Sequence, residues 1–199
     1  MRFFMLITFI DYILMSKGRL WNIIMMLTTA RLTLRLLTAD DWPLFFALHI
    51  NSQVIEKCFD KPPEAQIRAK FNERLKPWRP ASNQPLCMVI SENSSGKQVG
   101  VTGFTASQLA DIQEVGYLLL PEFYGRGYAT ESLNAFLTWA KGEFNIQLIK
   151  AVVSAGNIGS EKVLAKCGFK LVKVEPLAYE IGGVLIDDHY YLLDCTEKI

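Results

Sequence analysis

The stretch PEFYGRGYATES, from Pro121 to Ser132, carries the residues whose types and spacing point most clearly to chemistry. Gly125 and Gly127 flank Arg126 at the point where an apolar run gives way to a helix-forming segment. Glycines at such a junction allow consecutive backbone N–H groups to point into one concavity. Together with the positive end of the helix dipole and the Arg126 charge, these N–H groups predict a phosphate-binding site.

The glycine pair alone is weak evidence, because G-x-G also occurs in ordinary turns. Thr130 stands where the third glycine of a dinucleotide-binding G-x-G-x-x-G motif belongs, and the G-x-x-x-x-G-K-[ST] motif is absent from the sequence. The missing fingerprint argues against a dinucleotide-dependent oxidoreductase. An ordinary turn and a pyrophosphate site both remain open on the glycines alone.

The composition fits one well-filled domain, since half of the 199 residues are hydrophobic. The 21 basic and 20 acidic residues nearly cancel and form no block of like charge, so we expect no nucleic-acid partner. Four widely spaced cysteines without a C-x-x-C pair, and two histidines, argue against a metal site. We expect reduced thiols and a cytoplasmic location.

Residues 1–26 form an apolar N-terminal extension that opens with MRFFMLITFIDYILM. Asp11 interrupts the apolar run, which is shorter than the roughly 20 residues that a membrane-spanning helix needs. No small-residue cleavage site follows it, which argues against a secretory signal. A membrane-surface helix, an added packing helix and a mis-called start before Met25 or Met26 remain open. We expect a single domain over residues 27–199.

The rest of the chain alternates strand-like and helix-like segments. Strands are predicted at 31–38, 85–92, 98–107, 113–120, 147–155, 169–180 and 187–194. Helices are predicted after a cap at Thr38 or Asp40, and at 64–75, 129–141 and 158–166. Asn157 suits the N-cap of the last helix, and Gly168 suits its C-terminal cap. These segments predict one α+β domain with a largely antiparallel sheet.

The segments EVGYLLLPEFYGRGYATESL and NIGSEKVLAKCGFK together resemble the GNAT acyl-CoA N-acyltransferases. They are most similar to the RimJ/RimL-like branch, the ribosomal-protein N-terminal acetyltransferases. The segment RLTLRLLTADDW also resembles the opening strand and helix of that branch. The resemblance covers about Thr29 to Leu193. It implies a GNAT fold with a mixed, mostly antiparallel central sheet, splayed fourth and fifth strands and flanking helices. It also implies acetyl-CoA as co-substrate, with no metal.

In that family, the loop after the fourth strand wraps the CoA pyrophosphate, and the pantetheine arm lies between the splayed strands. The matching loop positions are Tyr124, Gly125, Arg126, Gly127, Tyr128, Ala129 and Thr130. The strand edge facing the arm would be Leu118, Leu119 and Leu120, and Asn157 would face the arm from the last helix. Glu122 departs from the family signature, which has Gln or Arg there. An acid cannot donate to phosphate, so Glu122 is left out of the site.

The resemblance also suggests the catalytic residues. Glu114 matches a favoured general base of Rim-like enzymes, although an exposed strand carboxylate without a role is the alternative. Ser160 matches the serine proposed to protonate the departing CoA thiolate. Many other GNAT enzymes place a tyrosine one turn further on, where this chain has Leu164. The proton donor is therefore expected to be Ser160 or solvent.

Other chemically capable residues are expected to be structural. Tyr117 suits a packed strand aromatic, His189 a structural residue of the last strand, and Cys167 a core thiol without a base partner. Tyr179 lies where Rim-like enzymes form part of the acceptor pocket, so a role there stays open.

The sequence therefore predicts an acetyl-CoA-dependent N-acetyltransferase in which a primary amine attacks the thioester directly, in a ternary complex. Branch analogy makes the acceptor a protein or peptide N-terminal amine. A small-molecule amine acceptor is the first alternative, and a non-catalytic acyl-CoA-binding sensor is the second. A monomer and a homodimer suit the prediction equally, and a membrane partner is expected only if residues 1–24 are native and interfacial.

Overall fold

The computed structural model describes residues 26–78, 84–105, 112–144 and 146–196. Its strands are β1 (Met26–Thr28), β2 (Leu32–Leu36), β3 (Leu86–Glu92), β4 (Gln98–Thr105), β5 (Ile112–Leu119), β6 (Leu148–Ser154), β7 (Lys170–Ile181) and β8 (Val184–Asp194). Its helices are α1 (Trp42–Ile50), α2 (Ser52–Ile55), α3 (Glu64–Arg74), α4 (Tyr128–Phe144) and α5 (Ile158–Lys166), with 3-10 turns η2 (Ala39–Asp41) and η3 (Pro121–Phe123). The predicted N-terminal extension lies outside the described residues, apart from Met26.

The strands form one sheet in the order β1-β2-β3-β4-β5-β6-β8-β7. Neighbouring strands are antiparallel except β5 and β6, which run parallel. A parallel pair needs a crossover connection, and α4 supplies it. The sheet is therefore mixed and mostly antiparallel, as the sequence predicts.

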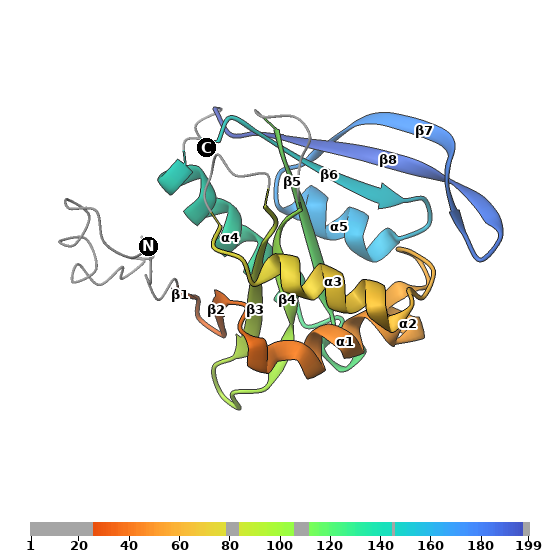
Figure 1. Ribbon diagram of the computed structural model, residues 1–199. Coiled ribbons are helices and arrows are strands. Elements are labelled where there is room, and N and C mark those ends of the chain that lie inside the picture. The colour runs from red at the N-terminus through yellow and green to blue at the C-terminus, as the bar shows by residue number, and fades with distance from the viewer. Residues whose placement is uncertain (1–25, 79–83, 106–111, 145, 197–199) are drawn as a thin grey trace.

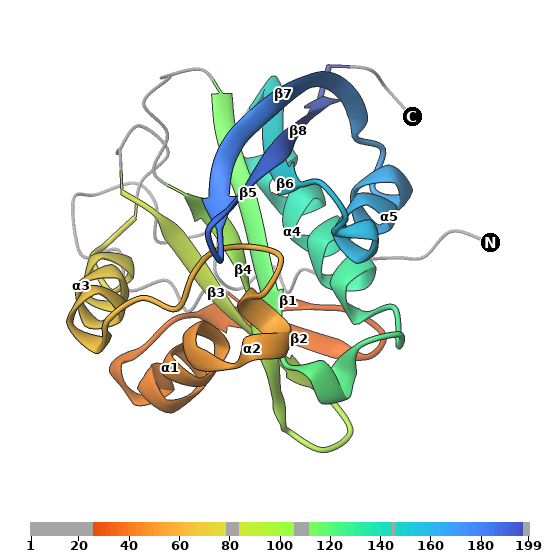
Figure 2. The ribbon, with the colours of Figure 1, turned by 90° about the vertical axis from the view of Figure 1, so that its right-hand side faces the viewer.

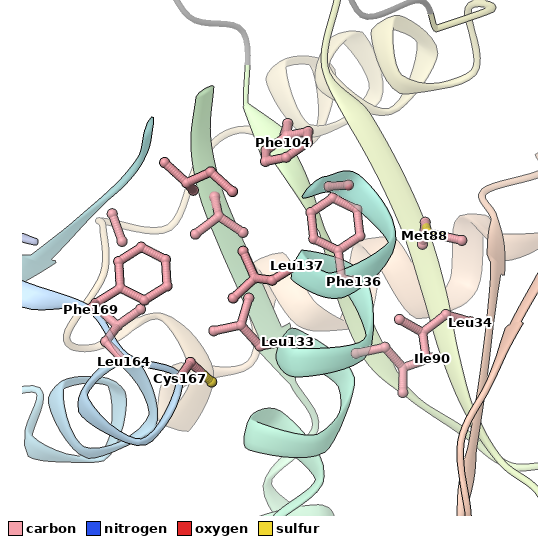
Figure 3. Packing of buried hydrophobic residues seen from close by; sticks show 14 of the residues in the cluster. Leu34, Met88, Ile90, Phe104, Leu133, Phe136, Leu137, Leu164, Cys167 and Phe169 are labelled. Carbon is pink, nitrogen blue, oxygen red and sulfur yellow. The ribbon is translucent and has the colours of Figure 1, made fainter. Parts of the chain in front are cut away.

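Helices cover both faces of the sheet (Figures 1 and 2). On one face, α4 and α5 pack against the strands, and the Phe136 ring of α4 meets Phe104 of β4 edge-on at 4.8 Å between ring centroids (Figure 3). On the other face, α1 and α3 bury a second cluster that includes Phe45, Ile67 and Phe71. Apolar residues spaced three and four apart place one face of each helix in the core.

The pairing of β5 with β6 is short. Only Ile112–Glu114 pairs with Leu148–Lys150, and the remaining residues of the two strands have no register with one another. Figure 1 shows the two strands separating beyond this point. If the three-residue β1 is not counted, these are the fourth and fifth strands, so the predicted splay is confirmed.

Both strands of the splayed pair lead toward a helix N-terminus. β5 continues through η3 into α4, and β6 continues through Asn157 into α5. Because β5 and β6 are parallel, their carboxyl ends lie on the same side of the sheet, at the wide end of the gap. The fold therefore brings two helix N-termini to the place where the strands are furthest apart.

Three details correct the sequence-based expectations. Helix α3 ends at Arg74, one residue before the predicted end, and Leu75 is its exposed C-cap. Thr38 caps η2, whereas the N-cap of α1 is Asp41. The segment between the first two predicted helices contains the four-residue helix α2, which is too short to show a helical period in the sequence. Within the described residues, no helix is long and apolar enough to cross a membrane.

Candidate active site

The glycine loop, defined here as Tyr124–Gly127, is exposed along its whole length between η3 and α4. Gly125 and Gly127 have φ angles of 73° and 79°, in the left-handed region that favours glycine. A Cβ atom on Gly127 would also lie 3.5 Å from Nη2 of Arg31. The backbone of this loop therefore depends on glycine, as the sequence predicts.

The first turn of α4 leaves backbone N–H groups without helical acceptors. The N–H of Glu131 donates to the carbonyl of Gly127 at 3.0 Å, so the N–H groups of Tyr128, Ala129 and Thr130 precede the first helical bond. α4 is 17 residues long, which gives its N-terminus a full dipole effect. The loop and this turn together offer N–H groups in the arrangement that binds phosphate.

Arg31, directly before β2, braces the glycine loop. Its Nη1 donates to the Arg126 carbonyl at 2.9 Å, and its Nε donates to Glu131 Oε2 at 2.7 Å. Glu131 also accepts from Thr29 Oγ1 at 2.6 Å. Burial acts to raise the pKa of Glu131, but the hydrogen bonds from Thr29 and Arg31 hold it below its ordinary value. These contacts tie the loop to the turn between β1 and β2.

A second carboxylate stands beside the loop. Glu92 accepts a hydrogen bond from the Tyr128 hydroxyl at 2.5 Å, and its Oε1 lies 4.0 Å from Nη1 of Arg126. Hydrogen bonds from Ser95 and Tyr128 lower the pKa of Glu92. The Arg126 side chain is half exposed and only loosely paired, which leaves it free to reach a phosphate.

A cavity of about 130 Å³ lies between the separated parts of β5 and β6. Its lining comes from the turn after α2, from β5, from β6 and from α5 with its N-cap: Lys57, Cys58, Val115, Gly116, Tyr117, Ala151, Val152, Val153, Ser154, Asn157, Ser160 and Leu164. Drug-sized ligands occupy pockets of roughly 300 Å³ or more, so this volume suits a narrow, unbranched chain. The cavity lies where the resemblance places the pantetheine arm.

Asn157 and Ser160 meet at one wall of this cavity. Asn157 caps α5, because its Oδ1 accepts from the Ser160 N–H at 3.2 Å. Its Nδ2 also lies 3.8 Å from the sulfur of Cys58. Ser160 is half-buried, and both side chains line the cavity. The capping role of Asn157 is confirmed. This role is compatible with a contact between Asn157 and a pantetheine arm in the cavity.

Glu114 stands at the narrow end of the gap, at the last pair between β5 and β6. Its Oε2 forms an ion pair with Nζ of Lys150 at 2.9 Å, and both side chains are about a quarter exposed. Glu114 does not line the cavity, but Val115 and Gly116 directly after it do. Its role as a base therefore stays a prediction, with the carboxylate next to the cavity and partly open to water.

The three leucines predicted to face the arm lie beyond the cavity along the same strand. Leu119 is buried in the core beneath α4, whereas Leu118 and Leu120 pack partly against the cluster under α1. The strand residues that line the cavity are Val115, Gly116 and Tyr117. Contact between the leucines and a bound arm stays a prediction. Glu122 is exposed in η3.

The remaining sequence candidates lie elsewhere. Nδ1 of His189 is 3.0 Å from Oε1 of Glu161, a contact that joins β8 to α5 and supports a structural role. Cys167 is buried, and burial raises the pKa of its thiol to about 11, which makes it a poor nucleophile. Tyr179 is exposed on β7 and pairs with Ile186.

Among the polar side chains that line the cavity, four were not assigned to the site from the sequence: Lys57, Cys58, Tyr117 and Ser154. Burial raises the pKa of the Cys58 thiol, so it is not an activated nucleophile. Tyr117 could have been found from its alternation with Val115 and Leu119, which places all three on one face of β5. Across the described residues, no group of three His, Cys, Asp or Glu side chains could hold a metal ion.

A sequence model of the acetyltransferase (GNAT) domain matches residues 31–170. The chain therefore belongs to the GNAT acetyltransferase family, and its enzyme class is N-acetyltransferase. YoaA, an uncharacterised N-acetyltransferase of Bacillus subtilis (strain 168), is 26% identical over 145 residues, which cover 72% of this chain and 82% of that protein.

Two solved structures illustrate the likeness in fold. Spermidine N-acetyltransferase from Vibrio cholerae, in complex with CoA and spermine, has a TM-score of 0.74 and 19% identity, over 84% of this chain and 98% of that one. RimL, a ribosomal-protein α-N acetyltransferase in complex with CoA, has a TM-score of 0.72 and 19% identity, over 83% of this chain and 95% of that one. The predicted GNAT fold is confirmed.

Proposed function

We propose that this protein transfers the acetyl group of acetyl-CoA to the N-terminal amine of a protein or peptide. The observation that carries the proposal is the gap between β5 and β6, which holds a cavity, together with the chain that leads from the end of β5 through η3 to the glycine loop and α4. A long cofactor with a phosphate group in its middle and a narrow thiol-bearing arm fits this arrangement. Membership of the GNAT family supports acetyl-CoA as that cofactor.

The residues that would hold CoA divide into two groups. The N–H groups of the loop and of the first turn of α4 would bind the pyrophosphate, with Arg126 adding a positive charge. Leu118, Leu119 and Leu120, together with Asn157, would contact the arm. The positive φ angles of Gly125 and Gly127 support this fit, because this backbone conformation allows consecutive N–H groups to point into one anion-binding concavity.

In the proposed reaction, the neutral amine attacks the thioester carbonyl carbon. A C–N bond forms and the C–S bond breaks, and the electron pair of the C–S bond goes to sulfur. Glu114, directly or through one water, takes the proton that the amine nitrogen loses. Ser160, or water, supplies a proton to the thiolate. Ser160 is half-buried and lines the cavity, and the half-buried Glu114 directly precedes the lining residue Val115, which supports these assignments.

The protein N-terminal acceptor rests on the similarity to the RimJ/RimL-like branch. A small-molecule amine is the alternative acceptor, since a spermidine N-acetyltransferase shares the fold. We place the reaction in the cytoplasm, because all four cysteines are free thiols and two of them are buried. A non-catalytic sensor is the remaining alternative. It would keep the glycine loop and need neither Glu114 nor Ser160.

The test is a mass-spectrometric screen of acetyl acceptors. The purified protein is incubated with acetyl-CoA and a panel of peptides with free N-termini, blocked peptides with a free lysine, polyamines and other small amines. We expect acetylation at the α-amine of free N-termini. Acetylation of small amines only would replace the proposed acceptor class, and binding of acetyl-CoA without any product would favour the sensor.

A further inference from the structure

The hydroxyl of Tyr117 reaches the wall of the cavity, although the ring of Tyr117 packs partly against the core. Tyr117 lies on β5 just past the last pair with β6, and it lines the cavity together with Ser160 and Leu164. Its hydroxyl donates to the backbone carbonyl of Ser160 at 3.3 Å. The ring packs partly against the core beneath α4 and α5. The aromatic body is thus structural, as the sequence suggests, but its polar end reaches the cavity wall at the start of α5.

The hydrogen bond that Tyr117 makes is a weak one. O–H···O bonds in proteins cluster near roughly 2.7–2.8 Å, so 3.3 Å is long. The accepting carbonyl also belongs to a residue inside α5, where it already serves the helix. The hydroxyl can therefore turn to a better acceptor in the cavity at little cost. A thiolate would be such an acceptor, because hydrogen bonds to charged groups are stronger than neutral ones.

The helix position that bears a tyrosine in many GNAT enzymes holds Leu164, which is fully buried and cannot donate. Tyr117 brings a phenol into the same cavity from the opposite wall, on β5. A strand residue thus supplies the type of donor that the helix lacks. It does so beside Ser160, the other hydroxyl assigned to the sulfur.

We propose that the Tyr117 hydroxyl donates a hydrogen bond to the CoA sulfur as the C–S bond breaks. Tyr117 is then a catalytic residue, together with Ser160. This inference rests on the proposed function, since it requires the thioester to lie in the cavity. The electron pair of the broken C–S bond goes to sulfur, and the Tyr117 hydroxyl stabilises that charge while keeping its own proton. Ser160 or water then protonates the thiolate.

The protonation state of Tyr117 suits a donor. Burial raises the pKa of its hydroxyl, and hydrogen bonding with the Ser160 side chain acts in the opposite direction. The net effect is upward, so the phenol keeps its proton throughout the neutral and mildly alkaline range. Tyr117 is therefore available as a hydrogen-bond donor at every pH at which the amine can attack.

The test uses Tyr117→Phe, which removes one oxygen atom and keeps the ring that packs against the core. Tyr191→Phe is the matched control, because Tyr191 is buried in the same core cluster, on β8, and does not line the cavity. We expect Tyr117→Phe to lower kcat about 10-fold to 100-fold with little change in KM for acetyl-CoA. The control should leave both constants unchanged.

A second readout addresses the sulfur directly. The thiol of bound CoA is titrated by its ultraviolet thiolate absorbance in the wild-type protein and in both variants. We expect the pKa of the bound thiol to lie below that of free CoA, and to rise by about one unit or more in Tyr117→Phe only. A merely structural tyrosine would change the melting temperature and leave this pKa where it was.

The outcomes separate this inference from the proposed function. Binding of CoA to the wild-type protein with a thiol pKa no lower than that of free CoA overturns the role of Tyr117 and leaves the acetyltransferase proposal standing. An unchanged kcat in Tyr117→Phe does the same. If the wild-type protein does not bind CoA at all, both proposals fail. The wild-type titration decides the matter even if Tyr117→Phe folds poorly.

Discussion

The glycine loop and the cavity between β5 and β6 differ in nearly every physical respect. The loop is exposed and built on left-handed glycines. Arg31, just before β2, donates to its Arg126 carbonyl, and Glu92 of β3 lies 4.0 Å from the Arg126 side chain. Apart from the exposed Lys57, the cavity is lined by buried and half-buried residues from strands and a helix around the gap. In our proposal, the loop offers backbone N–H groups to the solvated pyrophosphate, whereas the cavity offers side-chain hydroxyls to the reacting sulfur.

This contrast predicts a division of labour that kinetics can separate. Interactions with phosphates far from the reacting bond are the same in ground and transition states, so losing them raises KM or Kd. Interactions with the sulfur and the attacking amine form in the transition state, so losing them lowers kcat. Variants in the two regions should therefore fall into two kinetic classes.

The largest effect is expected at Glu114. Glu114→Gln removes the proposed base but preserves size, and it should lower kcat about 100-fold or more with little change in KM for acetyl-CoA. Glu175→Gln is the matched control, because Glu175 forms a similar ion pair with Lys173, at 2.8 Å, on the distant strand β7. Steady-state kinetics distinguish the two variants. Full activity in Glu114→Gln would move the base elsewhere.

The next effect is expected in the loop, at Gly127. Alanine there must adopt a φ of 79°, which costs about 1–3 kcal/mol in strain or displaces the loop. We expect Gly127→Ala to weaken CoA binding about 10-fold to 100-fold by calorimetry, with kcat retained at saturation. Gly142→Ala is the control, since Gly142 lies inside α4 with open space around it. A wild-type Kd in Gly127→Ala would count against a phosphate site in this loop.

Ser160→Ala tests the cavity with a smaller change. If water can replace Ser160 as proton donor, kcat should fall about 10-fold and CoA affinity should stay within a factor of two. Asn157→Ala, in the same turn, should instead cost about 1 kcal/mol of unfolding free energy through the lost cap. Kinetics and urea unfolding of both variants separate chemistry from capping. Equal kcat values in Ser160→Ala and the wild type would remove Ser160 from the mechanism.

The smallest effect is expected at Arg31, which supports the loop from outside. Its ion pair with Glu131, at 2.6 Å, is partly exposed, so Arg31→Ala should cost about 0.2–1 kcal/mol of unfolding free energy. CoA affinity should fall about threefold, because the Arg126 carbonyl loses a donor that fixes the loop. Lys173→Ala removes an exposed ion pair far from the loop and should affect neither affinity nor kcat. Equal CoA affinities in both variants would contradict the bracing role.

Local signals made much of the fold predictable from the sequence. Helix α5 begins and ends at the predicted residues. Asn157 caps its N-terminus through its side chain, and Gly168, with a φ of 87°, follows its C-terminus in the left-handed conformation. The hairpin of β3 and β4 was predictable from two apolar runs around a turn-forming segment. By contrast, β1 and α2 span three and four residues, too few to show a period.

The site was predictable only where it is local. The glycine pair predicts a left-handed backbone from residue type alone. The contact between Arg31 and Glu131 joins residues 100 positions apart, so no local pattern predicts it. The cavity depends on how far β5 and β6 diverge, and no sequence pattern states that distance. The sequence predicts Tyr117 as a packed aromatic, and its ring does pack against the core, but only the placement of α5 shows that its hydroxyl reaches Ser160.

The most direct test of the proposed site is a crystal structure of the wild-type protein bound to CoA. We predict the pyrophosphate within hydrogen-bonding distance of the N–H groups of the loop and the first turn of α4. We predict the sulfur in the cavity, beside the hydroxyls of Tyr117 and Ser160. A complex in which CoA lies outside the gap between β5 and β6, or in which Gly125 and Gly127 make no phosphate contact, would contradict the proposal.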